Sequence, residues 1–152
     1  MYYESMLKEK LQQEMKEALK SGDSQKRTLL GMVLSAVKNK EIEKRSELTD
    51  EDVIGVISSE IKKRKDAVDQ FEKGGRPELA EGERKEAEIL MTYMPEQMSE
   101  EDIRNEIKKT ITETGAKDVK EMGKVIGAVI AKIKGKADGQ IVSRIVKEEL
   151  TK

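Results

Sequence analysis

Six basic residues stand close together near the carboxyl end of the chain, and their ammonium and guanidinium groups suit phosphate oxygens. They are Lys124, Lys132, Lys134, Lys136, Arg144 and Lys147. Between positions 122 and 147 they meet a single acidic residue, Asp138. Gly135 and Gly139 interrupt helical structure beside them, and a helix start there adds amide donors. The pattern predicts a surface that binds the phosphates of an RNA.

A simpler interpretation competes with that one. Asp138 stands where a helix begins, and a capping carboxylate occupies the free amides and repels an anion. A cap surrounded by solvated lysines therefore explains the same residues equally well. The two interpretations differ in salt dependence, because each phosphate neutralised adds about −0.7 to −0.9 to the log-log slope of affinity against salt.

The element that must position these cations is a helix with two ordered stripes. Apolar residues recur at steps of three and four and form one predicted core face: Met122, Ile126, Val129, Ile130 and Ile133. Small residues form a second stripe at steps of four: Gly123, Gly127 and Ala131. Each interior glycine costs a helix about 1 kcal/mol relative to alanine, which indicates close approach by another group. Packing by a neighbouring helix is the favoured explanation, and room for a ligand is the alternative.

The rest of the chain shows the periodicity of amphipathic helices with recognisable ends. Helices are predicted at 4–20, 25–44, 49–71, 78–93, 99–115, 118–135 and 138–150. No segment alternates apolar and polar residues as a half-buried strand does. The predicted fold class is all-α and multihelical, with a larger N-terminal helical subdomain at 1–96 and a small C-terminal three-helix subdomain at 97–152. The boundary lies within Met94-Pro95-Glu96-Gln97, where a helix stop and a proline precede a new cap.

The composition excludes several classes of function. The 152 residues include no Cys and no His, which excludes disulfides, thiolate metal sites and classical hydrolase triads. We expect no metal and no cofactor. Neither terminus has the long apolar segment of a signal sequence or membrane span, so we expect a cytoplasmic protein without a membrane partner. The aromatic residues are too few for base stacking on single strands: Tyr2, Tyr3, Phe71 and Tyr93.

Charged residues elsewhere have other interpretations. The run from Lys62 to Lys65 wraps around a helix, so most of it is predicted to be solvated. Arg76, between glycines and a proline, is predicted to clamp a carboxylate across the subdomain junction, with phosphate binding as the alternative. Three acidic residues of the fourth helix are predicted to face solvent or form salt bridges rather than bind a metal: Glu83, Glu86 and Glu88.

The order of short motifs resembles the YqeY-like family over nearly the whole chain. This family shares its helical architecture with the tail of the B subunit of the glutamine-dependent aspartyl/glutamyl-tRNA amidotransferase. The motifs are Glu60-Ile61-Lys62-Lys63-Arg64, Gly75-Arg76-Pro77-Glu78-Leu79, Tyr93-Met94-Pro95, Met98-Ser99-Glu100-Glu101, Met122-Gly123-Lys124-Val125-Ile126 and Lys134-Gly135-Lys136-Ala137-Asp138-Gly139. Each is weak alone, but their order is specific. Gly31 is a departure, because the family pattern has an arginine in the second helix.

The resemblance implies an accessory protein that binds tRNA in connection with glutamine-dependent transamidation. Family-level labels extend carbon–nitrogen ligase activity, with glutamine as amido-N-donor, to such chains. We expect no autonomous catalysis and assign no catalytic residue, because no spacing places a nucleophile beside a base. The expected partners are tRNA and a protein of the aminoacylation or transamidation machinery. The alternative function is a helical protein–protein interaction module.

Overall fold

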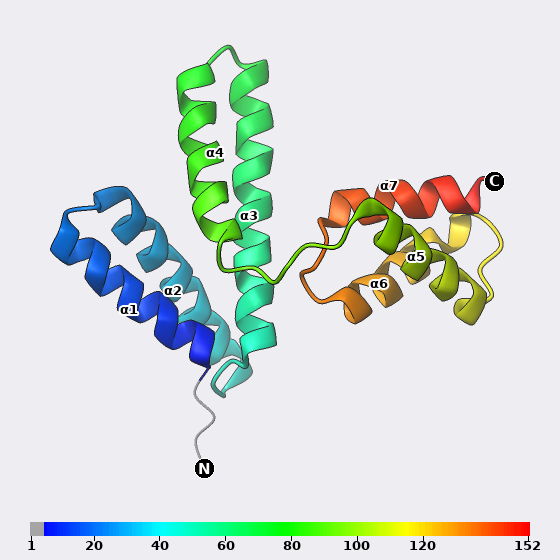
Figure 1. Ribbon diagram of the computed structural model, residues 1–152, viewed down its shortest axis with the longest axis horizontal. Helices are drawn as coiled ribbons and strands as arrows, with labels where there is room; N and C mark the ends of the chain where they lie inside the picture. The colour runs from blue at the N-terminus through cyan, green and yellow to red at the C-terminus, as the bar shows by residue number, and fades with distance from the viewer. Residues whose placement is uncertain (1–4) are drawn as a thin grey trace. The chain divides into compact units, whose positions relative to one another are not determined.

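The computed structural model describes residues 5–152, which form helices joined by short connections and contain no strand. The elements are α1 (Met6–Ser21), α2 (Ser24–Lys44), α3 (Asp50–Lys73), α4 (Pro77–Met91), α5 (Glu100–Thr114), the 3-10 turn η1 (Val119–Glu121), α6 (Met122–Ile133) and α7 (Gly139–Leu150) (Figure 1). The predicted all-α class is confirmed. Glu4, the predicted start of the first helix, lies outside the described residues, as do Tyr2 and Tyr3. The chain divides into two compact units, which we call unit 1 (Met1–Met94) and unit 2 (Pro95–Lys152).

Side-chain caps fix where several of the helices begin. Ser5, Thr49 and Ser99 each accept a hydrogen bond from the amide three residues on, at 3.1 to 3.2 Å. Asp52 accepts in return from the Thr49 amide at 3.2 Å, which completes a capping box at the start of α3. The caps satisfy amides that have no partner inside the helix, so the sequence sets these boundaries locally.

Unit 1 is built from two helical hairpins, α1 with α2 and α3 with α4 (Figure 1). Residues from all four helices form its core: Leu11, Leu29, Leu30, Val33, Val37, Val53, Ile57, Ile61 and Leu90. Tyr93 follows α4 and packs on this core, and its hydroxyl donates a hydrogen bond to Glu14 at 2.8 Å. The Lys10 ammonium lies 5.5 Å from the centre of the same ring. Tyr93 therefore ties the end of α4 to α1.

Glu41 joins α1 and α2 to the loop that precedes α3. Its carboxylate accepts hydrogen bonds from the Lys8 ammonium at 2.9 and 3.1 Å and from the Leu48 amide at 3.1 Å. The bond from Lys8 is the largest cause that holds the pKa of Glu41 below its ordinary value of 4.5. Because the folded pKa is lowered, the contribution of Glu41 to stability is present above that value and is lost as the pH falls through the folded pKa.

We expect Glu41→Ala to lower the free energy of unfolding by about 1–2 kcal/mol at neutral pH, because it removes charged hydrogen bonds and unpairs the Leu48 amide. The difference from the parent protein should shrink as the pH falls below about 4.5. Urea unfolding followed by circular dichroism measures both effects. Glu43→Ala on the same helix is the control, since Glu43 is exposed and lies 3.9 Å from Lys40. Equal losses in the two variants would contradict the role of Glu41.

Unit 2 is a bundle of α5, α6 and α7. Its core contains apolar residues of all three helices: Ile103, Ile107, Val125, Val129, Ile133, Val142, Ile145, Val146 and Leu150. Arg104 of α5 pairs with Glu148 and Glu149 of α7, each at 2.7 Å, along the seam between these helices. Among the described residues of both units, no helix is long and apolar enough to cross a membrane.

Candidate functional site

The helix α6 carries the predicted cation-rich surface, and it begins through a tight turn. Asp118 accepts a hydrogen bond from the Lys120 amide at 2.9 Å and caps η1, so it does not cap α6 directly as predicted. From Met122 onward, α6 contains no acidic residue. The predicted end at Gly135 is also displaced by one residue, because Lys134 already adopts left-handed backbone at the end of the helix, with φ of 41°.

The core face of α6 differs from the predicted one at its edges. Val125, Val129 and Ile133 are buried, whereas Ile130 is 45% exposed. Two other predicted members are half-buried: Met122 and Ile126. Val125 and Ile130 lie about 140° apart around the helix axis, on opposite edges of the apolar stripe. The bundle covers the Val125 edge, so the prediction that Ile130 belongs to the core is wrong.

The small-residue stripe of α6 faces open space. Gly123, Gly127 and Ala131 are all exposed, and a Cβ atom added at either glycine would meet no heavy atom within 4 Å. The favoured prediction, that a neighbouring helix packs closely on this stripe, is therefore wrong for the described residues. The glycines instead leave bare main chain at the surface, which a partner can approach more closely than a side chain would permit.

Lys132 is held in the seam between α5 and α6. Its ammonium forms an ion pair with Glu113, lies 3.6 Å from Glu106, and donates a hydrogen bond to the Thr110 hydroxyl at 3.2 Å. The bond to Glu113 raises the pKa of Lys132, and the same bond lowers the pKa of Glu113. Lys132 is therefore neutralised within unit 2 and is a poor candidate for RNA contact.

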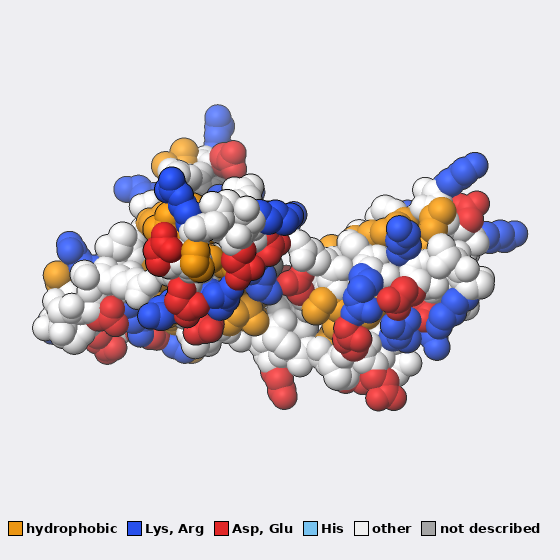
Figure 2. Space-filling model, turned by 90° about the horizontal axis from the view of Figure 1, so that it is seen from above, with side chains coloured by type: hydrophobic (Ala, Val, Ile, Leu, Met, Phe, Trp, Pro, Cys, Tyr) orange, Lys and Arg blue, Asp and Glu red, His pale blue; other side chains and the backbone are white. Residues whose placement is uncertain are grey.

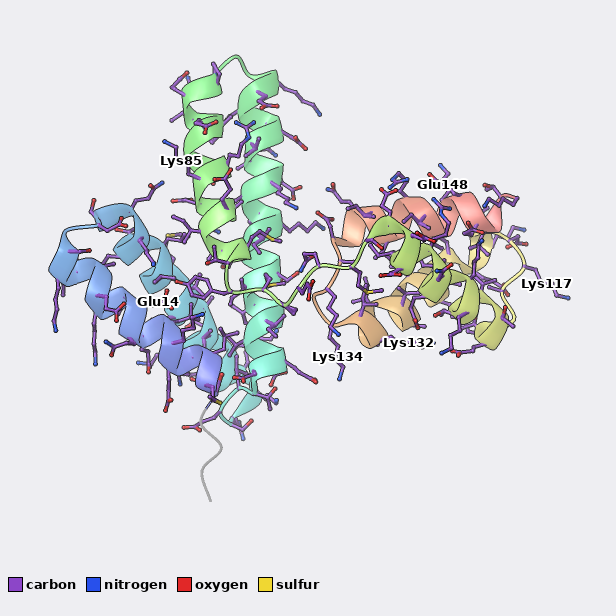
Figure 3. The ribbon with its side chains drawn as sticks, in the orientation of Figure 1. Glu14, Lys85, Lys117, Lys132, Lys134 and Glu148 are labelled. Atoms are coloured by element: carbon purple, nitrogen blue, oxygen red, sulfur yellow. The ribbon has the colours of Figure 1, made fainter. Side chains whose placement is uncertain are left out.

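Arg144 is likewise paired, but on the other side of the bundle. It forms ion pairs with Glu100 of α5 and, at 3.0 Å, with Glu148 of α7. Figure 3 shows Glu148 on the α7 side of unit 2, while Lys132 and Lys134 lie on the α6 side. The six predicted cations thus do not form one continuous patch.

The remaining predicted cations are exposed, and three of them make no ion pair with a described residue: Lys124, Lys136 and Lys147. Lys147 stands three residues beyond Arg144 and shares its side of α7. Lys124 instead lies beside the open stripe of α6, and Lys134 and Lys136 follow in the turn after it. We call the open stripe of α6, together with the lysines beside it and in the turn after it, the α6 face: Gly123, Lys124, Gly127, Ala131, Lys134 and Lys136.

The turn between α6 and α7 is held by the segment that precedes α5. The Met98 amide donates to the Lys136 carbonyl at 2.8 Å, and the Gln97 side chain donates to the Gly135 carbonyl at 3.0 Å. Asp138 accepts from the Gln140 amide at 2.7 Å and caps α7, as the simpler interpretation predicts. The Gln140 amide at the start of α7 is therefore satisfied from within, and the Asp138 carboxylate beside it disfavours an anion there.

A buried ionic cluster in unit 1 is absent from the sequence-based predictions. Arg64 of α3 is 5% exposed, its Nη1 donates to Glu60 Oε2 at 2.5 Å, and its Nε lies 3.4 Å from Glu86 Oε2 of α4. The prediction that most of the basic run is solvated is confirmed, since its other three members are exposed, and Arg64 is the buried exception. Burial, followed by the charge of Glu86, raises the pKa of the nearby Glu83. The spacing of four between Glu60 and Arg64 is the one signal that could have found the pair.

Other predicted charged sites find no support as ligand sites. Arg76 precedes α4 and is exposed, and its side chain does not cap that helix. The clamp across the subdomain junction stays a prediction. Acidic and basic side chains are interspersed over each unit on the face drawn in Figure 2. Within residues 5–152, no group of three or more acidic side chains could hold a metal ion.

Comparison with known proteins identifies relatives of this chain by sequence. The family model described as Yqey-like protein matches residues 8–150. Curated relatives named "Altered inheritance of mitochondria protein 41, mitochondrial" are similar in sequence. The Kluyveromyces lactis protein is 38% identical over 84 residues, 55% of this chain and 45% of the relative. The Saccharomyces cerevisiae protein (strain YJM789) is 34% identical over 116 residues, which cover 72% of this chain and 63% of the relative. The chain spans about half the length of the first of these relatives.

Proposed function

The chain belongs to the Yqey-like protein family, and on that premise we propose that it is a tRNA-binding accessory protein related to glutamine-dependent tRNA transamidation. The α6 face is the proposed contact surface. The observation that carries the proposal is the combination, on one acid-free helix, of open main chain at Gly123 and Gly127 with the unpaired Lys124. The connection with transamidation and with carbon–nitrogen ligase chemistry rests on the resemblance to the amidotransferase tail.

The chemistry of the α6 face suits a folded RNA backbone. Phosphate contacts position a protein on nucleic acid, and lysine ammonium groups supply them without demanding a base sequence. A glycine stripe lets the ribose-phosphate chain approach the helix axis closely. Aromatic residues for base stacking are scarce, with one Phe and three Tyr in the chain, so recognition would depend on shape and backbone charge.

The proposed surface is narrower than the six-cation patch. Lys132 and Arg144 are paired with carboxylates, and Lys147 lies on the other side of the bundle with Arg144. A protein partner from the aminoacylation or transamidation machinery, and a cytoplasmic location, stay predictions. The alternative function, a helical protein–protein interaction module, draws support from a groove between α1 and α2 of unit 1.

We expect purified protein to bind bulk tRNA at low salt, with an affinity that falls steeply as salt rises. Lys124→Glu combined with Lys136→Glu should weaken binding at least tenfold at low salt and flatten the log-log slope by about 1.4 to 1.8, because two phosphate contacts are removed. Filter binding with labelled tRNA across a salt series measures both quantities. Absence of tRNA binding at low salt would refute the proposed function.

Lys147→Glu is the control, since it makes the same change of charge as either single substitution, in the same unit but outside the α6 face. It should alter affinity much less than the double variant does. If all three substitutions weaken binding equally, the contact extends around the bundle and the α6 face is the wrong surface. If tRNA binds the double variant as tightly as the parent, this face makes no contact.

A further inference from the structure

An open groove lies between α1 and α2 in unit 1, on a surface that the RNA proposal does not use. It has a volume of roughly 370 Å³ and is lined by Met15, Lys16, Leu19, Arg27, Thr28 and Gly31. The lining includes large apolar side chains and two cations but no acidic residue. It is distinct in composition from the α6 face, where the exposed side chains are mainly small.

The floor of the groove is apolar and uncovered. Of its two large apolar side chains, Leu19 is 58% exposed and Met15 is half-buried. Gly31 lies opposite Met15, because a Cβ added at Gly31 would come 3.8 Å from the Met15 sulfur. Any longer side chain at this position would occupy the groove. The glycine thus keeps open a space that exposes apolar surface to water at a cost in free energy.

The rim of the groove carries positive charges that are not paired with carboxylates of the described residues. Lys16 and Arg27 make no ion pair with a described residue. Over the first 17 residues of α2, 24–40, the sequence contains four basic residues and no acid. Of these four, Lys26 is paired with Glu14 at 3.4 Å and Lys40 lies 3.9 Å from Glu43. Two uncompensated charges therefore flank an apolar floor.

We propose that this groove binds an acidic amphipathic helix of a partner protein. Leucine-like anchors of such a helix would bury Leu19 and Met15, and its glutamates or aspartates would meet Lys16 and Arg27. Charge complementarity selects an acidic partner, and the apolar floor distinguishes it from RNA, whose phosphates gain nothing from contact with Met and Leu side chains. The surface between these two helices is a groove, which suits a rod-shaped ligand better than a flat lipid surface.

The test uses a fluorescein-labelled synthetic helix with leucines at positions i, i+3, i+4 and i+7 and glutamates on both flanks. Fluorescence anisotropy should show saturable binding to the full chain. Gly31→Leu should weaken it at least tenfold by filling the floor, and so should Lys16→Glu combined with Arg27→Glu. Gly31→Ala adds a single methyl group at ordinary contact distance, so it should leave binding within about threefold of the parent.

Control probes separate shape from charge. A peptide with its leucines replaced by glutamine, and one with its glutamates replaced by lysine, should each bind at least tenfold more weakly. Lys62→Glu on exposed α3 should leave the binding of the acidic helix unchanged. Equal binding of the glutamine peptide would overturn the proposal, because charge alone would then explain it. Absence of binding to a chain with parental circular dichroism would also overturn it. So would displacement of the peptide by bulk tRNA or by phosphatidylserine vesicles, if Gly31→Leu leaves that competition unchanged.

Discussion

Arg64→Met is expected to lower the free energy of unfolding by about 3–5 kcal/mol at neutral pH. The guanidinium is buried against Glu60, which is 8% exposed, and its Nε lies 3.4 Å from the Glu86 carboxylate. Met has a similar length and keeps the apolar packing, but it removes the buried guanidinium that faces both carboxylates and leaves Glu60 only the exposed Lys63 as a counter-charge. Urea unfolding followed by helical circular dichroism measures the loss.

The pH dependence of the Arg64→Met variant provides a second signature. The pKa of Glu83 is already raised by burial and by the charge of Glu86, and Arg64 opposes that rise. Removing Arg64 should therefore raise it further. A carboxyl whose folded pKa is raised costs least stability below its unfolded pKa and most above its folded pKa. The variant should accordingly recover part of its lost stability as the pH falls toward about 4.5.

Two further variants test whether the stability lost in Arg64→Met comes from the burial of the ion pair or from the loss of a positive charge. Lys63→Met on the same helix removes an exposed cation 3.6 Å from Glu60 and should cost less than about 1 kcal/mol. Arg64→Met combined with Glu60→Leu removes the closest buried pair together and should be less damaging than Arg64→Met alone. A loss for Arg64→Met no larger than that for Lys63→Met would show that the cluster contributes nothing to stability.

Local signals predict the helices well because their physical causes are local. The pairs Thr49 with Asp52 and Ser99 with Asp102 mark the starts of α3 and α5, since caps act within one turn. Asp118 shows the limit of this reasoning. It has the expected capping bond, but a 3-10 turn intervenes before α6, and a side chain in a cap cannot specify which kind of helix follows.

Burial is harder to predict. Periodicity identifies the apolar side of a helix, but it does not show which edge of that side the neighbouring helices cover. On α6, Val125 and Ile130 border the same stripe, and only the positions of α5 and α7 decide that the first is buried and the second exposed. Arg64 is a stronger case. A basic run on a helix usually faces solvent, and the sequence does not reveal that α4 covers one member of it.

The candidate site is predictable in composition but not in extent. The sequence locates the cations and the glycine stripe, since both can be found by counting residues and their spacing along the chain. Pairing of Lys132 with Glu113, and of Arg144 with Glu100, joins residues 19 and 44 positions apart. Such pairs arise only when the helices are packed, so a net charge counted along the chain overstates the charge available to a ligand.

Gly123→Gln combined with Gly127→Gln should stabilise the protein and impair RNA binding at the same time. Glutamine favours the helix interior over glycine by roughly 0.5 kcal/mol at each position, and an added Cβ at either site meets no heavy atom within 4 Å outside the helix's own backbone. The free energy of unfolding should therefore rise by about 1 kcal/mol for the pair. Affinity for tRNA should fall at least tenfold, because two side chains would hold the phosphate backbone away from the helix without any change in net charge.

Gly55→Gln supplies the matched control. Gly55 is an exposed interior glycine of α3 with no heavy atom within 4 Å of an added Cβ, so this variant should gain a similar stability per site and bind tRNA as the parent does. Filter binding and urea unfolding on the same preparations compare the two effects. Because a stabilised protein cannot lose binding through unfolding, a loss confined to the α6 variant would identify close approach to the main chain as its cause. Unchanged tRNA affinity in that variant would mean that the glycines have no part in contacting RNA.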